Sequence, residues 1–173
     1  VGELLTQWSE EPGGGPRLEV LVQGQGGRHE LLRRFERAAL PGVPGAVLVA
    51  SASFWEGVDL PGDALQLVVI DKLPFPPPDD PLVQARCHHI EQAGGAPFNR
   101  YFLPEAAVAL KQGAGRLIRS EHDRGVLVVC DVRLLGKGYG RRLLAGLPAM
   151  RRVPDAQAMG AELDALLTTP STT

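Results

Sequence analysis

The sequence is poor in cysteine and contains no long apolar run. Its 173 residues include only two cysteines, Cys87 and Cys130, and no C-x-x-C pair. That count argues against a disulfide framework and against a tetrahedral metal site. No stretch approaches the roughly 20 consecutive apolar residues that span a bilayer, and the N-terminus lacks a basic region followed by an apolar one. We therefore predict a cytoplasmic protein that is neither secreted nor inserted in a membrane.

The chain also lacks an overall excess of charge, although its charges are segregated. The net charge is −2, which argues against a protein that binds nucleic acid by electrostatics alone. Residues 111–152 nevertheless hold ten lysines and arginines against three acidic residues, a net of +7, and the rest of the chain carries −9. Arginine outnumbers lysine 15 to 3, an excess that genomic base composition also explains. The basic segment is a candidate surface for a polyanion.

Apolar residues make up 44% of the chain, enough to bury the core of one domain. Continuous β-branched runs predict strands of a parallel sheet that is covered on both faces. Between these runs apolar residues recur at helical spacing, and Leu31, Leu32 and Phe35 share one face. Alternating strands and helices predict an α/β fold. Strands are expected at residues 18–22, 46–50, 66–71 and 126–131, and helices at 28–39, 81–93 and 104–118.

Polar residues and glycine follow the second predicted strand, in residues 51–62. Ligands of open α/β sheets bind beyond the carboxyl ends of the strands, so this segment is a candidate site. Ser51 and Ser53 can donate hydrogen bonds to phosphate. Glu56 and Asp59 can accept hydrogen bonds from ribose hydroxyls, from arginines or from water.

The most informative motif is Gln112-x-x-Gly115-Arg116-x-x-Arg119, at the end of the third predicted helix. On a helix, a spacing of three places Arg116 and Arg119 on one face, where both guanidinium groups can meet a polyanion. Arginine suits this task because its planar fork stays charged and donates paired hydrogen bonds to phosphate. Gln112 lies one turn earlier on nearly the same face. A solvated basic face is the alternative, although glycines inside a helix are costly.

These motifs together resemble a known family. Residues 53–62 look like motif V and residues 112–119 like motif VI of superfamily-two helicases of the XPD type, in the DinG/YoaA branch. The resemblance covers about residues 18–148, and it is specific because several motifs agree in order and spacing. Other segments similar to that branch are residues 69–82, residues 124–133 and, for the motif IV region, residues 22–35.

The resemblance implies a RecA-like three-layer α/β sandwich with a mainly parallel sheet. Residues 1–150 would be the second motor domain of the helicase, and residues 151–173 a C-terminal tail with a short helix. In such helicases ATP and magnesium lie mainly on the first RecA-like domain of the same chain. The second domain closes over the γ-phosphate.

The resemblance also implies roles for individual residues. Arg119 would be the arginine finger, with Arg116 as its companion, although either arginine satisfies the position nearest the γ-phosphate. Gln112 would position the attacking water or the γ-phosphate. The remaining implied nucleotide contacts are Glu56, Gly57, Asp59 and Gly115.

Several motifs that are typical of the family are absent from this sequence. It holds no G-x-x-x-x-G-K-[ST] loop and no Asp-Glu-x-His run, and its two cysteines do not match the spacing of the family's iron–sulfur ligands. These parts belong to the first motor domain and its insertions. We therefore expect a C-terminal fragment, inactive alone, of a 5′–3′ DNA helicase of DNA repair whose full-length form has a place for an iron–sulfur cluster.

Single-stranded DNA is the partner that the resemblance implies. Ser51 and Ser53 are predicted to contact its phosphates, which position a strand without reading its sequence. Trp55 and Phe75 are predicted to stack on bases, because both lie in segments that follow strands. Packing inside the protein is the alternative for each aromatic residue. Residues 72–81, with five prolines, are expected to be extended.

Two other functions stay open at this point. The chain could be a non-catalytic RecA-like adaptor whose tail helix, residues 155–167, binds a replication or repair partner. It could also be a generic nucleotide-binding α/β domain, but the glycine-rich loop that such a domain needs is missing.

Overall fold

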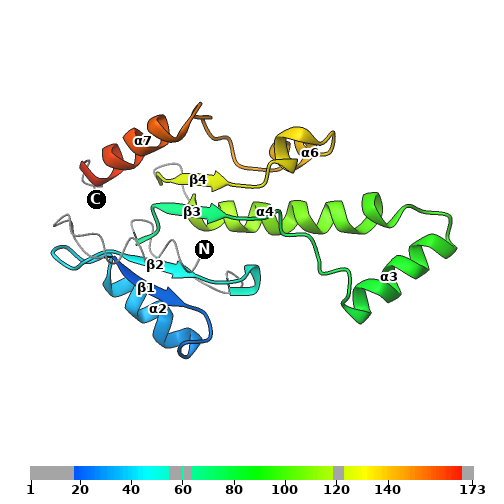
Figure 1. Cartoon of the computed structure of the whole chain (residues 1–173), viewed down its shortest axis with the longest axis horizontal. Coiled ribbons are helices and arrows are strands. Elements are labelled where there is room, and N and C mark those ends of the chain that lie inside the picture. The colour runs from blue at the N-terminus through cyan, green and yellow to red at the C-terminus, as the bar shows by residue number, and fades with distance from the viewer. Residues whose placement is uncertain (1–17, 55–59, 61–63, 119–122, 169–173) are drawn as a thin grey trace. The chain divides into compact units, whose positions relative to one another are not determined.

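The computed structural model describes residues 18–54, 60, 64–118 and 123–168, which divide between two units (Figure 1). In the first unit, Val1–Leu65, helix α2 (Arg28–Arg37) connects strands β1 (Glu19–Val22) and β2 (Ala46–Val49). The strands pair in parallel, with Val20 opposite Val47. A parallel pair needs such a crossover connection. A short 3-10 turn, η1 (Ala52–Phe54), follows β2.

The core of the first unit lies between α2 and its two strands. Leu21 of β1 is 1% exposed and Leu31 of α2 is 2% exposed. Phe54 and Leu60 complete the buried cluster. Leu32 and Phe35 pack against this cluster, so the predicted apolar face of α2 is confirmed.

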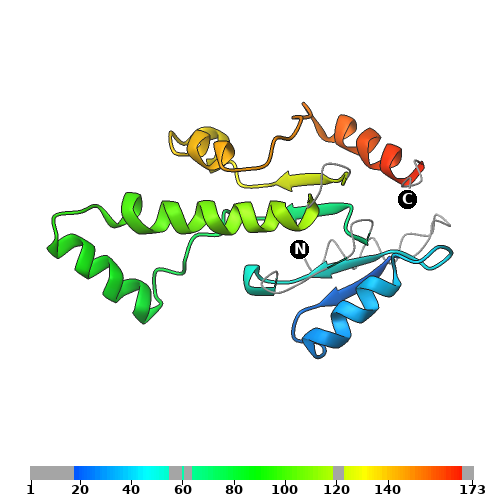
Figure 2. The same ribbon diagram turned by 180° about the vertical axis from the view of Figure 1, so that it is seen from behind.

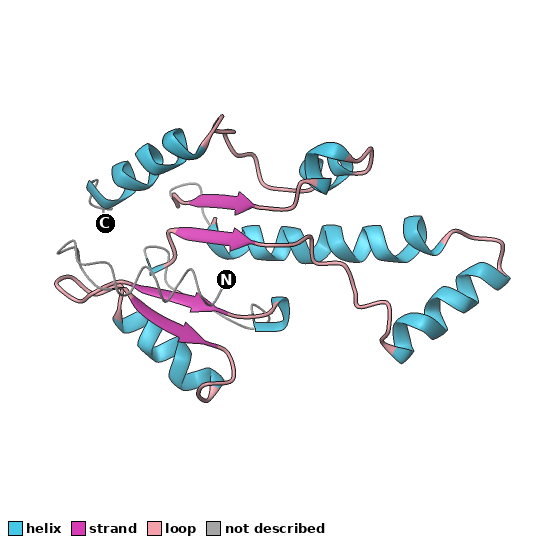
Figure 3. Ribbon diagram, viewed as in Figure 1, coloured by secondary structure: helices cyan, strands magenta, loops and turns pink. Residues whose placement is uncertain are grey.

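The second unit, Gln66–Thr173, contains a second parallel pair and most of the helices (Figures 1 and 3). Asp80 caps the amino end of the first of these helices, α3 (Pro81–Gln92), because its carboxylate accepts a hydrogen bond of 2.7 Å from the Leu82 N–H. Pro81, the first residue of α3, suits that position because it needs no N–H partner there. The elements are β3 (Leu67–Ile70), α3 (Pro81–Gln92), the π-helical turn η3 (Phe98–Phe102), α4 (Leu103–Leu117), β4 (Val126–Val129), α5 (Arg133–Gly136), α6 (Gly140–Ala145) and α7 (Ala156–Thr168).

Helix α4 packs across β3 and β4 (Figures 1 and 2). Its buried residues recur every three or four positions, as in Ala106, Leu110 and Ala114, each 0% exposed. The carboxyl end of α4 lies beside the first residues of both strands. A Cβ on Gly125 would lie 2.3 Å from Leu117 Cδ1 and 3.1 Å from the Gln66 carbonyl oxygen. The helix therefore runs antiparallel to β3 and β4.

The four strands and the three long helices between them are confirmed, and both strand pairs are parallel as predicted. The described strands form two parallel pairs, one within each unit. In β3, Val69 is 55% exposed and Ile70 only 4%. None of the described helices is long and apolar enough to cross a bilayer.

Candidate functional site

The carboxyl ends of β1 and β2 are joined by the side chain of Gln23. Its Oε1 accepts hydrogen bonds from the Ser51 N–H at 2.7 Å and from the Ser51 hydroxyl at 2.9 Å. Because that oxygen accepts two hydrogen bonds from Ser51, the amide NH₂ group is the part of the Gln23 side chain that can donate hydrogen bonds. Gly24 follows with φ 95°, a left-handed conformation that favours glycine and turns the chain toward α2.

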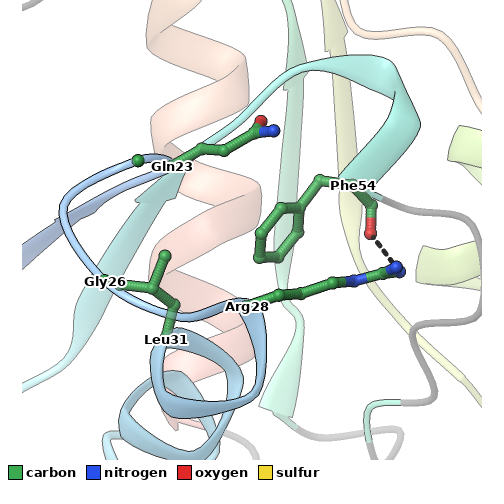
Figure 4. A pocket seen from close by; sticks show the side chains of 6 residues that line it. Gln23, Gly26, Arg28, Leu31 and Phe54 are labelled. Carbon is green, nitrogen blue, oxygen red and sulfur yellow. Dashed lines mark hydrogen bonds between the residues drawn. The ribbon is translucent and has the colours of Figure 1, made fainter.

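Gln23 is also part of an open pocket of about 350 Å³ in the first unit (Figure 4). Arg28 crosses this pocket, donates a hydrogen bond of 3.0 Å to the Phe54 carbonyl oxygen, and lies 5.4 Å from the centre of the Phe54 ring. Gly27 caps α2 without a side-chain hydrogen bond. An arginine, an amide group and the start of a helix suit an anion such as phosphate. The residues that line the pocket are Gln23, Gly24, Gly26, Arg28, Leu31 and Phe54.

The structure brings Ser51, a predicted phosphate contact, next to Gln23, which lines a pocket with Arg28. The sequence analysis placed both residues in the motif IV region but did not choose either as a site residue. The signal for them was the glycine-rich turn at residues 23–27, between a predicted strand and a predicted helix. The other candidates after β2 lie outside the described residues: Trp55, Glu56, Gly57, Asp59 and the side chain of Ser53.

The end of α4 presents two of the predicted motif VI residues together. Gln112 and Arg116 lie one helical turn apart, with Gln112 exposed and Arg116 half-buried. Ala114 and Leu117 are buried, so they anchor the opposite side of this turn in the core. At Gly115 a Cβ would meet nothing within 4 Å, so the space beside it is open.

The helix-face argument for the two arginines does not hold in the structure. Helix α4 ends at Leu117, and Ile118 has extended backbone with φ −122° and ψ 107°. The helix on which the spacing of three was counted therefore holds Arg116 and ends one residue later, at Leu117. Arg119 itself lies outside the described residues.

Phe75, predicted to stack on DNA, lies far from Gln112 and Arg116. It follows the carboxyl end of β3, and its ring centre is 5.9 Å from that of Phe98, which precedes α4. Arg116 lies at the other end of α4, whose 15 residues span roughly 22 Å. The second unit therefore separates the predicted stacking residue from the predicted nucleotide contacts.

Asp131, which the sequence analysis did not select, holds the carboxyl ends of β3 and β4 together. Its carboxylate accepts hydrogen bonds from the Leu73 N–H at 2.9 Å and from the Arg133 side chain at 2.6 Å, and its side chain is 6% exposed. The Arg133 hydrogen bonds, helped by the Leu73 N–H, hold the pKa of Asp131 well below its usual 3.8 although burial opposes this. Arg133 lies 5.5 Å from the centre of the Phe75 ring.

Comparison with known proteins decides the family. A family model described as the helicase C-terminal domain matches residues 2–150. This chain belongs to the helicase C-terminal domain family. Among its relatives, the ATP-dependent DNA helicase YoaA of Escherichia coli (strain K12) is 52% identical over 138 residues, 80% of this chain and 21% of that protein. The ATP-dependent helicase DinG of Mycobacterium tuberculosis (strain ATCC 25618 / H37Rv) is 40% identical over 144 residues, 83% of this chain and 21% of that protein.

A third relative has a different name, the 3'-5' exonuclease DinG of Bacillus subtilis (strain 168). It is 41% identical over 133 residues, 76% of this chain and 14% of that protein. The helicase C-terminal domain thus spans about a fifth or less of the length of these relatives. The predicted resemblance to the DinG/YoaA branch is confirmed.

Proposed function

We propose that this helicase C-terminal domain is the second RecA-like motor domain of an ATP-dependent 5′–3′ DNA helicase of the cytoplasm. ATP and Mg²⁺ bind mainly on a first RecA-like domain of the same chain, and this domain supplies motifs V and VI to the nucleotide. The fold of this domain is then a RecA-like three-layer α/β sandwich with a mainly parallel sheet. Residues 1–150 form the motor domain, and residues 151–173 form its tail.

The position of Gln112 and Arg116 at the end of α4 supports this proposal most directly. The two polar side chains share a turn whose other side is buried in the core of the second unit. Phosphoryl transfer offers a protein little except positioning and the stabilisation of charge, so donors on a rigid element are what the reaction needs. Gln112 positions the attacking water or the γ-phosphate, and Arg116 stabilises its charge beside Arg119.

The Gln23 pocket supports the contact with single-stranded DNA. Gln23 and Arg28 both carry donors and line this pocket, and Ser51 holds the Gln23 side chain by two hydrogen bonds to its Oε1. Donors of this kind bind phosphates and set the position of a strand without reading its sequence. Ser53 and Trp55 extend the same contact along the segment after β2.

The adaptor function stays an alternative prediction. Helix α7, the predicted tail helix, packs against β4 of the second unit. Glu162 of α7 also pairs with Arg151. A replication or repair partner at the tail would therefore meet a helix that already has contacts within its own unit.

Reconstitution of ATP hydrolysis tests the proposed function. We expect the 173-residue chain alone to show no DNA-stimulated hydrolysis. Activity should appear when a protein that carries the first motor domain is added or fused to it, because the nucleotide then has both halves of its site. Phosphate release with single-stranded DNA measures the rate. Hydrolysis by the chain alone, or no stimulation by it of the first domain, would contradict the proposal.

Replacement of Gly115 with alanine should raise stability and lower activity. Alanine favours a helix over glycine by roughly 0.5–1 kcal/mol, and the added Cβ meets no atom of a described residue within 4 Å. If the nucleotide approaches this open space, the same methyl group should reduce DNA-stimulated hydrolysis by about tenfold, equivalent to about 1.4 kcal/mol. Urea unfolding and the rate of the combined protein measure the two effects.

Gly160 in α7 provides the matched control, because its Cβ would also meet nothing within 4 Å. Gly160→Ala should give a similar gain in the free energy of unfolding and leave the hydrolysis rate unchanged. An unchanged rate in Gly115→Ala would remove Gly115 from the nucleotide site.

A further inference from the structure

Three aromatic rings from distant parts of the second unit form one cluster at the carboxyl end of its strands. The ring centre of Phe75 lies 5.9 Å from that of Phe98 and 6.0 Å from that of Tyr139. The ring centres of Phe98 and Tyr139 are 5.2 Å apart. Such tilted and edge-to-face arrangements are favourable for aromatic pairs. The cluster contains Phe75 together with two rings that the proposed function does not use.

This aromatic cluster is not part of the buried core. Of the phenylalanines and tyrosines, all of which the structure describes, only Phe98 is exposed, with 41% of its surface accessible. Val132 and Leu135, which flank the Phe75 neighbour Arg133 in the chain, are 82% and 79% exposed. Part of the Phe98 ring is therefore at the surface of the second unit, where a ligand can reach it.

The cluster is held in place before any ligand arrives. Phe75 lies between Pro74 and Pro76, which restrict its backbone. Arg133 lies against the Phe75 ring, and Asp131 fixes that arginine through hydrogen bonds to its Nε at 2.9 Å and its Nη2 at 2.6 Å. A ring that is already ordered loses little conformational entropy when it binds.

The surface beside the rings is positively charged. No acidic residue occurs between Asp131 and Asp155, a segment that contains six lysines and arginines. Lys137, Arg141 and Arg142 are exposed, and none of them forms an ion pair with a described residue. Arg142 lies three residues after Tyr139 at the start of α6, so it is on the same side of the helix as that ring.

We propose that Phe75, Phe98 and Tyr139 form a stacking platform for the bases of single-stranded DNA, with Lys137 and Arg142 holding the adjacent phosphates. Aromatic rings next to unpaired cations match both parts of a single strand, because every base has a π-face and every linkage a charge. An acidic protein segment, by contrast, would contact the cations but would have no bases to stack on the rings. This inference rests on the proposed function, since it assigns a second contact to the strand that the motor domain binds.

Two oligonucleotides of equal length separate stacking from charge. A labelled oligo(dT) has bases, whereas an abasic strand of the same length has only the phosphates. Fluorescence anisotropy with the 173-residue chain measures both affinities. Phe98→Leu should weaken binding of oligo(dT) by roughly tenfold, the effect of one lost stacked base, and leave binding of the abasic strand unchanged. Phe98→Trp should preserve or strengthen binding of oligo(dT).

The cations and the aliphatic neighbours supply controls. We expect Lys137→Gln and Arg142→Gln each to weaken the binding of both oligonucleotides by the same factor. Each should also lower the slope of log affinity against log salt concentration by about one. Leu135→Ser, at an apolar residue that is 79% exposed, should change neither affinity. Urea midpoints verify that each variant is folded.

The outcomes separate this inference from the proposed function. Suppose that the unaltered chain binds oligo(dT), and that Phe98→Leu either weakens the binding of both oligonucleotides equally or leaves both affinities unchanged. The stacking platform is then wrong and the proposed function stands. Equal affinity of the unaltered chain for oligo(dT), the abasic strand and polyglutamate of equal charge would also overturn the platform. If the unaltered chain binds neither oligonucleotide, the proposed DNA contact fails and the platform with it.

Discussion

Replacement of Arg119 with alanine is expected to lower DNA-stimulated ATP hydrolysis by the combined protein by roughly 10³- to 10⁵-fold. An arginine finger contributes this much because the γ-phosphoryl group carries spread negative charge in the transition state, and few other groups on the protein can neutralise it. The rate of phosphate release at saturating ATP and DNA measures the effect. DNA binding should stay within about twofold, a change of less than 0.5 kcal/mol.

Lysine should not rescue Arg119. A lysine ammonium group is a point charge and lacks the planar fork that donates two hydrogen bonds to phosphate oxygens. Arg119→Lys should therefore also lose most of the rate. Arg116→Ala is the informative companion: because Arg116 lies within α4 and Ile118 is extended, the two arginines are not equivalent positions on one helix face. A larger loss in Arg116→Ala would assign the finger to Arg116.

Arg124 is the matched control for Arg119. It is exposed, it belongs to the same basic segment, and alanine there removes the same charge. Arg124→Ala should leave the maximal rate of hydrolysis within about twofold. A loss of less than tenfold in Arg119→Ala, or an equal loss in Arg124→Ala, would refute the assignment of the finger.

Replacement of Gly140 with alanine is expected to destabilise the domain by roughly 3–5 kcal/mol. A Cβ on Gly140 would lie 1.8 Å from the Leu134 carbonyl oxygen and 2.7 Å from the Leu134 carbonyl carbon. Both atoms belong to the backbone of α5, so a rotamer change cannot relieve the clash and α5 must move away from α6. Urea unfolding followed by circular dichroism measures the loss in the free energy of unfolding.

Gly138 supplies the control two residues earlier. A Cβ there would meet nothing within 4 Å, so Gly138→Ala should change the free energy of unfolding by less than about 1 kcal/mol. Because Tyr139 lies between the two glycines, Gly140→Ala should also weaken oligo(dT) binding. Equal stability of the two variants would show that α5 and α6 do not approach as closely as the structure places them.

The regular elements were predictable because their signals are local. Parallel pairing followed from continuous β-branched runs, and the faces of α2 and α4 followed from apolar residues three and four positions apart. The short helices α5 and α6 were not predicted. They have four and six residues, and Gly136, Gly138 and Gly140 lie within or between them. Neither helix is therefore long enough for its apolar pattern to repeat over several turns.

The candidate site was predictable in part. Ser51, Gln112, Gly115 and Arg116 were chosen from motif spacing, and the structure places the last three on one turn of α4. The spacing argument for Arg119 failed because a count of three residues implies a shared face only while the backbone stays helical. At Ile118 the backbone is extended, and only coordinates reveal where a helix stops.

By itself, the sequence determined the family of this protein and its parallel strand pairs, and it selected the candidate motif VI residues, because each depends on the order and spacing of near neighbours. Only the tertiary structure decided which distant residues meet. Gln23 with Ser51 is a contact across 28 positions, and Asp131 with Leu73 one across 58. The rings of Phe75 and Tyr139 meet across a similar span. Such contacts depend on how α2 and α4 pack onto their strands, and packing is a property of the whole unit.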